Sequence, residues 1–336
     1  MRLAIIDDYQ SVWDRFVDWG QVKGVTVVPF RDHVFEEAEL IARLSEFDAV
    51  LRIRERTEFP RHVLEALPRL KLLLATGMRN ARSIDLKAAE DQGITVCATT
   101  IRHHDSTVEV VWLLLLSLFR GFTGEVASLR AGGWQHGLGL GLEGKTLGIV
   151  GLGHMGQPVA RVAQAFAMNV IAWSPNLTAE RAAPFGVEAV SKEDLFRRAD
   201  AVTIHMPLSD RTIGVVNAED IGRMKPTAFL VNTSRPQLVD EDALVAALQA
   251  NRIAGAGMDV FTMEPLPAGH IYRTMPNVLA TPHIGFVTQE NYEVFFRQSC
   301  ENLQAYLDGT PIRRITPDVP YLPDAPLVDT APGDVT

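Results

Sequence analysis

Cysteine is scarce in this chain of 336 residues, in which Cys97 and Cys300 are the only two. The two thiols lie far apart in the sequence and lack the spacing of a metal or redox motif. The sequence therefore argues against a disulfide scaffold and against a cysteine zinc site. We expect both thiols to stay reduced in a cytoplasmic protein, and we expect no bound metal.

Positive charge is also in deficit, with 32 lysines and arginines against 41 aspartates and glutamates. The net charge of −9 argues against nucleic acid or an anionic membrane as a partner, because both need a basic face.

Long apolar runs are missing too. The most apolar segment, residues 110–119, falls well short of the ~20 residues that span a bilayer, and we expect it to form a helix buried on most sides. The apolar run before Asp7 is too short for a signal peptide.

Apolar residues nevertheless make up 47% of the chain, and its length suffices for two domains. Short apolar runs alternate with amphipathic segments, which predicts parallel strands joined by helices. The first series of expected strands covers residues 3–6, 25–29, 49–53, 70–75 and 94–97. The second covers residues 146–150, 170–173, 201–205, 228–232, 255–259 and 278–280, with a last long helix at 289–307. We predict an α/β protein with two doubly wound parallel-sheet domains.

Three glycines directly follow the expected strand 146–150. Gly151, Gly153 and Gly156 form a GxGxxG motif that opens an expected helix at 157–168. In such a turn glycine lets the backbone approach a pyrophosphate, and the N-terminus of the helix attracts its negative charge. The motif predicts a bound dinucleotide. The alternative is a glycine-rich turn without a ligand.

Ser174 bears on which dinucleotide is bound. It follows the next expected strand, where an acidic residue would normally bind the ribose 2′-hydroxyl of NAD. A serine hydroxyl can donate to a phosphate and does not repel it, which favours NADP while leaving NAD open. Asn176 and Arg181 are the nearest residues that could help to hold a 2′-phosphate.

Three polar residues follow expected strands of the second series. Arg235 can grip a carboxylate through two parallel hydrogen bonds. His283 can exchange a proton with an alcohol or a ketone, and Glu264 can fix its tautomer. Each residue alone is compatible with an ordinary surface or strand-end role. Together, downstream of a dinucleotide motif, they predict chemistry between a carbonyl and an alcohol.

The chain resembles the family of D-isomer-specific 2-hydroxyacid dehydrogenases, which includes glyoxylate/hydroxypyruvate reductases, phosphoglycerate dehydrogenases and D-lactate dehydrogenases. The matching stretches are residues 144–153, 205–208, 232–235, 239–244, 259–265 and 281–285. The resemblance implies transfer of a hydride between NAD or NADP and C2 of a small D-2-hydroxy or 2-oxo acid. It assigns the catalytic roles to Arg235, Glu264 and His283.

The resemblance also implies a domain plan. A Rossmann NAD(P)-binding domain at residues 103–285 is inserted into a flavodoxin-like substrate domain at 1–102 and 286–312, with the active site in the cleft between them. Residues 313–336, which contain five prolines, are expected to form an extended or partly disordered tail. Members are usually homodimers, with residues 110–119 near the contact.

Further site residues come from the same resemblance. Gly77 and Met78 would offer backbone N–H groups to the substrate carboxylate, and Arg54 would lie near the substrate. The residues expected at the cofactor are Thr107, Gly151, Gly153, His154, Met155, Gly156, Ser174, His205, Pro207, Thr212, Thr233, Ser234, Asp259 and Gly285.

Arg52, Arg54 and Arg56 alternate along an expected strand end, which predicts a shared face and either a local anion site or a solvated strand end. Pro236 departs from the glycine that is common in the family and is expected to reshape the substrate pocket.

Two alternatives to a 2-hydroxyacid dehydrogenase remain at this point. One is a dinucleotide-sensing scaffold or corepressor without catalysis, since fold alone does not settle function. The other is an enzyme like formate or phosphite dehydrogenase. Formate dehydrogenases usually carry a serine soon after the catalytic histidine, whereas Ile284 and Gly285 stand here.

Overall fold

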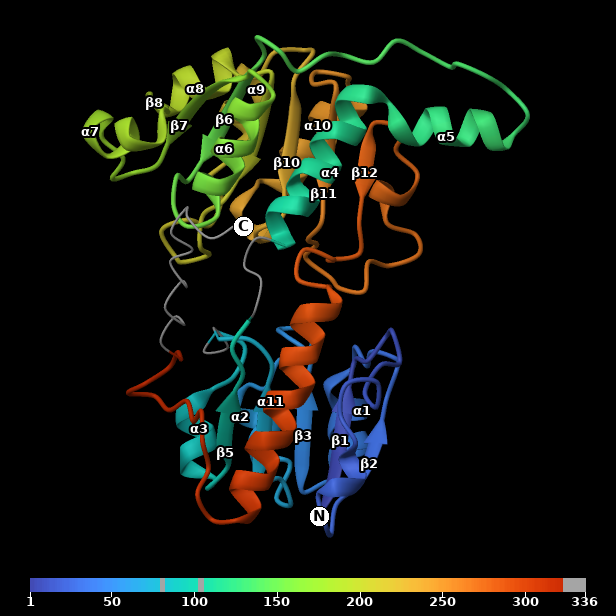
Figure 1. The fold of residues 1–336 in the computed structure, drawn as a ribbon, viewed down its shortest axis with the longest axis vertical. Helices are drawn as coiled ribbons and strands as arrows, with labels where there is room; N and C mark the ends of the chain where they lie inside the picture. The colour runs from blue at the N-terminus through green and yellow to red at the C-terminus, as the bar shows by residue number, and fades with distance from the viewer. Residues whose placement is uncertain (79–81, 102–105, 323–336) are drawn as a thin grey trace, which may run out of the picture. The chain divides into compact units, whose positions relative to one another are not determined.

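The computed structural model describes residues 1–78, 82–101 and 106–322. The chain divides into two compact units, residues 1–103 with 288–336 and residues 104–287. Each unit contains one parallel β-sheet (Figure 1). This confirms the predicted fold class of two doubly wound α/β domains.

The first unit has a five-stranded sheet in the order β2-β1-β3-β4-β5. Its strands are β1 (Arg2–Ile6), β2 (Thr26–Pro29), β3 (Ala49–Arg52), β4 (Leu72–Ala75) and β5 (Thr95–Ala98). Its helices are α1 (Glu37–Leu44), α2 (Arg61–Glu65), α3 (Leu86–Asp91) and α11 (Gln289–Leu307). The strand order is that of flavodoxin-like sheets.

Nearly all residues of β1, β3, β4 and β5 are buried on both faces, as a helix-covered parallel sheet requires, whereas the edge strand β2 is partly exposed. Ala4 and Ile6 of β1 pack in the core that α1, α2 and α3 complete, while the intervening Ile5 is also fully buried. Helix α11 contacts β4 and β5 (Figure 1). The C-terminal helix therefore belongs to the unit that the N-terminus begins.

The second unit has a seven-stranded sheet in the order β12-β11-β10-β9-β6-β7-β8. Its strands are β6 (Thr146–Val150), β7 (Asn169–Trp173), β8 (Glu188–Ala189), β9 (Ala201–Ile204), β10 (Phe229–Asn232), β11 (Gly255–Met258) and β12 (Val278–Ala280). Its helices are α4 (Ser106–Arg120), α5 (Phe122–Arg130), α6 (Gly156–Ala165), α7 (Ala179–Ala182), α8 (Lys192–Arg198), α9 (Ala218–Arg223) and α10 (Glu241–Gln249). Strands β7 and β8 are added on one side of β6, and the chain then crosses over to add β9 on its other side. A Rossmann sheet binds its dinucleotide at this crossover between the first and fourth strands.

Side-chain alternation divides the core of this unit between the two faces of the sheet. Leu147 and Ile149 of β6 pack with α4 and α6, whereas Val150 packs with α8, α9 and α10. By the same alternation, the neighbouring residues Leu230 and Val231 of β10 point to opposite faces of the sheet. Both faces are therefore covered by helices (Figure 1).

Most differences between the expected and observed elements are one or two residues at an end. The two-residue strand β8 was not expected, because it is too short to show a period. Residues 313–316, at the start of the expected tail, are tied to β5: Ala98 N–H donates to Arg313 C=O, and Ile315 N–H donates to Val96 C=O. Ile315 is 3% exposed.

The described residues include no single helix that is long and apolar enough to cross a membrane. Within this part of the chain, helices α4 and α5 reach that length and apolar composition when taken together, and they are bent by 67° relative to each other.

Candidate active site

Three loops carry the expected catalytic residues at one edge of the second sheet. They follow β10, β11 and β12, which are neighbours in the sheet and run parallel. Arg235 lies after β10, Glu264 after β11 and His283 after β12. Since the carboxyl ends of parallel strands lie at the same edge, this edge brings together Arg235 and His283, which are 48 residues apart in the chain.

Glu264 and His283 form a direct pair. Glu264 Oε2 lies 2.6 Å from His283 Nδ1, and Glu264 Oε1 accepts the N–H of Phe261 at 2.9 Å. Both side chains are about one-quarter exposed, at 24% and 23%. The carboxylate fixes Nδ1 as the protonated nitrogen, so Nε2 is available for a reacting group.

His283 also has an unusual backbone conformation, with φ of 51°. The left-handed region costs a residue with a Cβ about 1–2 kcal/mol, and such residues are often found at functional sites. Its ring packs at 80° to the ring of Phe286, with 5.4 Å between centroids. The imidazole is therefore held by a carboxylate, a strained backbone and an aromatic ring.

Asp259 links the loops after β11 and β12. Its carboxylate accepts hydrogen bonds from Thr281 Oγ1 at 2.6 Å, Ile284 N–H at 2.8 Å and Gly285 N–H at 2.9 Å. Burial nevertheless raises the pKa of this carboxyl group. Asp259 thus fixes the backbone on the C-terminal side of His283.

Arg235 lies in a hydrogen-bonded turn. Its Nη1 donates to Ser234 C=O at 2.7 Å, and Ser234 Oγ donates to Ile204 C=O at the end of β9, also at 2.7 Å. Pro236 begins a short 3-10 helix at Pro236–Leu238. Because proline has no N–H, it leaves no unsatisfied donor at this helix start.

The glycine motif forms a turn with no room for side chains at its first and last positions. Gly151 has φ of 100°, and a Cβ there would lie 2.8 Å from His205 C=O. A Cβ at Gly156 would lie 2.2 Å from Gly151 C=O. At Gly153, by contrast, a Cβ would meet no atom within 4 Å. Only the middle glycine faces open space, as expected where a pyrophosphate approaches.

The residues around this turn fit a dinucleotide. Helix α6 starts at Gly156, so its free N–H groups lie beside the open position at Gly153. Thr233 Oγ1 is buried and has no hydrogen-bond partner among the described residues. A buried hydroxyl without a partner is costly, which indicates a group that a ligand satisfies.

Other residues expected at the cofactor use their polar side chains within the protein. His205 Nε2 lies 2.9 Å from Thr203 Oγ1, and Thr212 Oγ1 donates to Pro207 C=O at 2.8 Å. Thr107 Oγ1 donates to Gly285 C=O at 3.1 Å. These contacts shape the loops around the strand ends. His154 and Met155 lie between Gly153 and the start of α6.

Ser174 follows β7 directly and is half-buried. Its C=O accepts the N–H of Leu177, which folds the chain into a turn. Arg181 donates from Nη1 to Asn176 C=O at 2.7 Å, so these two residues contact each other in the same short segment.

Acidification should destabilise the second unit through His205. Burial lowers the pKa of this side chain to about 4, so the unfolded chain takes up the proton first as the pH falls. The resulting stability is complete above pH ~6.5 and is lost as the pH falls towards 4. At pH 5 the expected loss is about 2 kcal/mol.

Urea unfolding of the wild type and of His205→Asn at pH 7.5 and pH 5 checks this expectation. Asparagine does not titrate, so the wild type should lose about 2 kcal/mol more than the variant on acidification. Equal losses in the two proteins would contradict a neutral, buried His205.

The residues expected at the substrate from the N-terminal part of the chain lie in the first unit. Arg54 has φ of 57°, and its side chain covers Gly77, where a Cβ would lie 2.0 Å from Arg54 Nη1. The N–H of Gly77 donates to Thr99 Oγ1 at 2.8 Å, and Met78 is 6% exposed. A substrate carboxylate at Gly77 would therefore compete with the Thr99 hydroxyl.

Arg52 does not belong to a shared anion site. Its side chain is fully buried and donates to Thr57 C=O and Ser83 Oγ. The alternation fails because β3 ends at Arg52 and Arg54 is left-handed. Arg56 lies over the Tyr9 ring, 4.3 Å from its centroid, and donates to Asp7 C=O.

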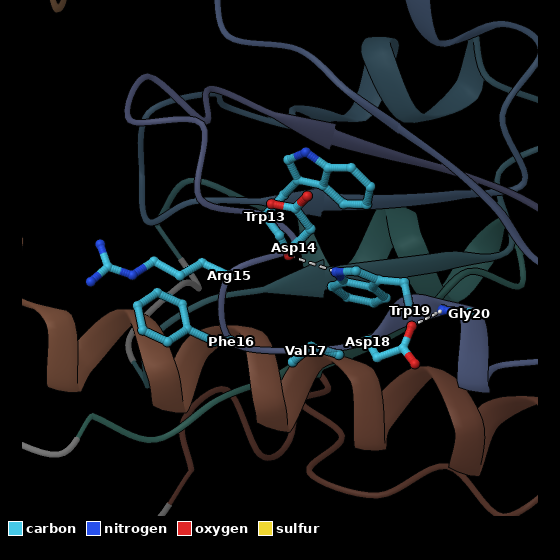
Figure 2. Close-up of a pocket in the computed structure, with 8 residues that line it drawn as sticks. All are labelled: Trp13, Asp14, Arg15, Phe16, Val17, Asp18, Trp19 and Gly20. Carbon is cyan, nitrogen blue, oxygen red and sulfur yellow. Dashed lines mark hydrogen bonds between the residues drawn. The ribbon is translucent and has the colours of Figure 1, made fainter.

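A hollow of about 440 Å³ lies elsewhere in the first unit, within residues 13–20. Figure 2 shows Trp19 Nε1 donating to Trp13 C=O and the N–H of Gly20 donating to Asp18. None of the expected site residues lines this hollow. The described part of the chain shows no group of three or more His, Cys, Asp or Glu residues that could hold a metal ion.

Known proteins resemble the chain in both sequence and structure. Residues 112–285 match the family model described as "D-isomer specific 2-hydroxyacid dehydrogenase, NAD binding domain". The chain is 35% identical to a glyoxylate reductase of Thermococcus litoralis, over 80% of this chain and 83% of that protein. It is 35% identical to a D-3-phosphoglycerate dehydrogenase of Synechocystis, over 89% of this chain and 56% of that protein.

A solved structure shows the same fold. The phosphoglycerate oxidoreductase of Vibrio cholerae superposes with a TM-score of 0.86 at 37% identity, covering 92% of this chain and 99% of the other. The chain spans about half the length of the phosphoglycerate dehydrogenases that it matches first. The match to the NAD-binding domain, together with the match over most of the glyoxylate reductase, shows that the chain belongs to the family of D-isomer-specific 2-hydroxyacid dehydrogenases.

Proposed function

We propose that the protein is an NAD(P)-dependent enzyme that interconverts a small 2-oxo acid and the corresponding D-2-hydroxy acid. The observation that carries this proposal is the 2.6 Å contact between Glu264 and His283. It lies at the carboxyl edge of a Rossmann sheet, beside the loop that holds Arg235. Such a pair can hold and release a proton where a dinucleotide binds.

The roles of the side chains follow from their chemistry. The nicotinamide, when bound, supplies or accepts the hydride at its C4. During reduction of the acid, His283 gives a proton from Nε2 to the carbonyl oxygen, while C2 gains the hydride. Glu264 stabilises the protonated imidazole before this transfer. Arg235 binds the substrate carboxylate and, with His283, places positive charge beside the developing alkoxide.

In the first unit, Arg54, Gly77 and Met78 stay proposed contacts of the acid. The names of the relatives support this substrate class, since they include a glyoxylate reductase and a hydroxypyruvate reductase. The same names and the Glu264–His283 pair favour an enzyme over a non-catalytic scaffold. They also favour a 2-hydroxy acid over formate or phosphite.

The proposal is tested by mixing the protein with glyoxylate, hydroxypyruvate or pyruvate, each with NADH or NADPH, and following the loss of nicotinamide absorbance. Oxidation of a reduced cofactor by at least one acid is expected. If a sample that binds the reduced cofactor oxidises it with none of these acids, the proposal is contradicted. The protein would then be an enzyme for another substrate or a scaffold without catalysis.

NADPH should be preferred over NADH, because Ser174 stands where an acidic residue would repel the 2′-phosphate. Ser174→Asp should reverse this preference. The introduced carboxylate accepts a hydrogen bond from the 2′-hydroxyl of NADH and repels the 2′-phosphate of NADPH. The ratio of kcat/KM for NADPH to kcat/KM for NADH should therefore fall about 100-fold.

Gln249→Glu is the matched control. Gln249 is exposed and is the last residue of α10, which leads to the amino end of β11, so this variant adds the same charge at the opposite edge of the sheet from Ser174. It should leave the cofactor ratio unchanged. A wild type that prefers NADH, or a ratio that Ser174→Asp does not move, would contradict the proposed role of Ser174.

We also propose that the protein is a homodimer that associates through α4, α5 and the segment that follows. Several large apolar side chains are exposed in this region. They are Leu113, Phe122, Leu129, Trp134 and Leu138. A surface with this many exposed apolar groups is typical of an interaction site, and sedimentation equilibrium should give the mass of two chains.

A cytoplasmic location is likewise a proposal. It is supported by the two cysteines, which are both free thiols. Burial raises the pKa of Cys97 to about 11 and also raises that of Cys300. Both thiols are therefore of the inert, structural kind.

A further inference from the structure

Asn232 is a fully buried polar residue directly next to the loop of Arg235. It is the last residue of β10, and none of its surface is exposed. Its Oδ1 accepts the N–H of Ser234 at 3.0 Å, and its Nδ2 donates to the C=O of Arg235 at 2.9 Å. One side chain thus binds the backbone on both sides of the Arg235 Cα.

The two backbone partners allow only one kind of side chain at this position. A backbone N–H can only donate and a C=O can only accept, so the side chain must present one acceptor and one donor. Among residues of this length only asparagine does both. Ionised aspartate would place an oxygen against Arg235 C=O, and leucine would leave both backbone groups without a partner.

Two further hydrogen bonds connect this turn to the neighbouring strands β9 and β11. The Ser234 hydroxyl donates to Ile204 C=O, and the backbone C=O of Asn232 accepts the N–H of Asp259. The side chain of Asn232 therefore sits where β9, β10 and β11 end together. Its amide sets the path that the chain takes from the sheet to Arg235.

We propose that Asn232 is a positioning residue that fixes the direction of the Arg235 side chain and thereby the affinity for the substrate carboxylate. This inference rests on the proposed function, in which Arg235 binds that carboxylate. Bidentate binding by a guanidinium needs a defined direction as well as charge. Without the amide, the Arg235 side chain keeps its charge but is no longer held in one orientation.

A double-mutant cycle tests this role. The four proteins are the wild type, Asn232→Ala, Arg235→Lys and the double variant, assayed with whichever of glyoxylate, hydroxypyruvate and pyruvate the wild type reduces fastest. Asn232→Ala should raise the KM for the acid about 30-fold, since it removes two buried hydrogen bonds next to the binding group. The Kd for NADPH, measured by fluorescence, should change less than twofold.

The effect of Asn232→Ala should disappear in the Arg235→Lys background, where it should change the KM less than threefold. Two groups that act through one contact are not additive, whereas independent effects multiply. Asn277→Ala is the matched control, because it removes an amide that donates to Leu248 C=O in the same unit. Its KM for the acid should stay within twofold of the wild type.

Three results would overturn the inference. An equal loss in the wild-type and Arg235→Lys backgrounds would make Asn232 an independent structural residue, and an equal weakening of NADPH binding would show a general disturbance of the unit. If Arg235→Lys itself leaves the KM for the acid unchanged, the proposed function of Arg235 fails first and the inference with it. Should Asn232→Ala not fold, Asn232→Ser gives the same cycle, with a shorter side chain that cannot reach both backbone groups.

Discussion

Replacing His283 should lower kcat by about 10³-fold while NADPH still binds. The imidazole is the proposed proton donor and acceptor, and its Nδ1 is already held by Glu264 at 2.6 Å. No other titratable group is proposed to exchange this proton. Steady-state kinetics of the variant, combined with a fluorescence titration of NADPH, separates the loss of chemistry from a loss of binding.

Two variants distinguish the imidazole from its backbone. His283 has φ of 51°, where alanine is strained but asparagine is tolerated comparatively well. His283→Ala and His283→Asn should therefore lose kcat alike, and only the alanine variant should lose stability as well. His62→Ala, at an exposed histidine on α2, should keep full activity. A His283→Asn enzyme with wild-type kcat would refute the assigned role.

Gly153→Ala should weaken dinucleotide binding at least tenfold without destabilising the fold. A Cβ at this position meets no protein atom within 4 Å, so the fold has room for it. The methyl group would instead occupy the space that the pyrophosphate approaches. Isothermal titration with NADPH gives the affinity, and a thermal melt gives the stability.

Gly156→Ala is the matched comparison within the same motif. A Cβ at Gly156 would lie 2.2 Å from the backbone C=O of Gly151. The turn must shift to accept it, so this variant should lose both stability and affinity. If Gly153→Ala binds NADPH as tightly as the wild type, the turn does not hold the pyrophosphate.

The sequence was sufficient to predict elements whose signal is local. Residues 146–150 and 278–280 were predicted as strands and are β6 and β12, because a short apolar run that ends at a glycine or a polar residue is typical of a parallel strand. The order of the motifs also predicted that Arg235, Glu264 and His283 follow three strands of one sheet. Strand β8 is too short for any periodicity to reveal it.

Contacts between residues distant in the sequence could not be predicted in this way. No local pattern shows that Ser234 Oγ bonds to Ile204 C=O, or that Thr99 accepts the N–H of Gly77. The sequence also placed Arg52 beside Arg54 and Arg56, but the end of β3 and the left-handed Arg54 break the alternation. Asn232 was missed because its partners are backbone groups, although an asparagine ending a buried strand was a visible signal.

Transfer of a labelled hydride shows whether the enzyme reduces C2 of a 2-oxo acid with hydride from the nicotinamide. The protein is incubated with hydroxypyruvate or pyruvate, whose products have a stereocentre at C2, and with NADPH carrying deuterium at both C4 positions, and the product is examined by chiral chromatography and mass spectrometry. The expected product is the D-2-hydroxy acid with one deuterium, bound to C2. A product without deuterium at C2, or one of L configuration, would contradict the proposed function.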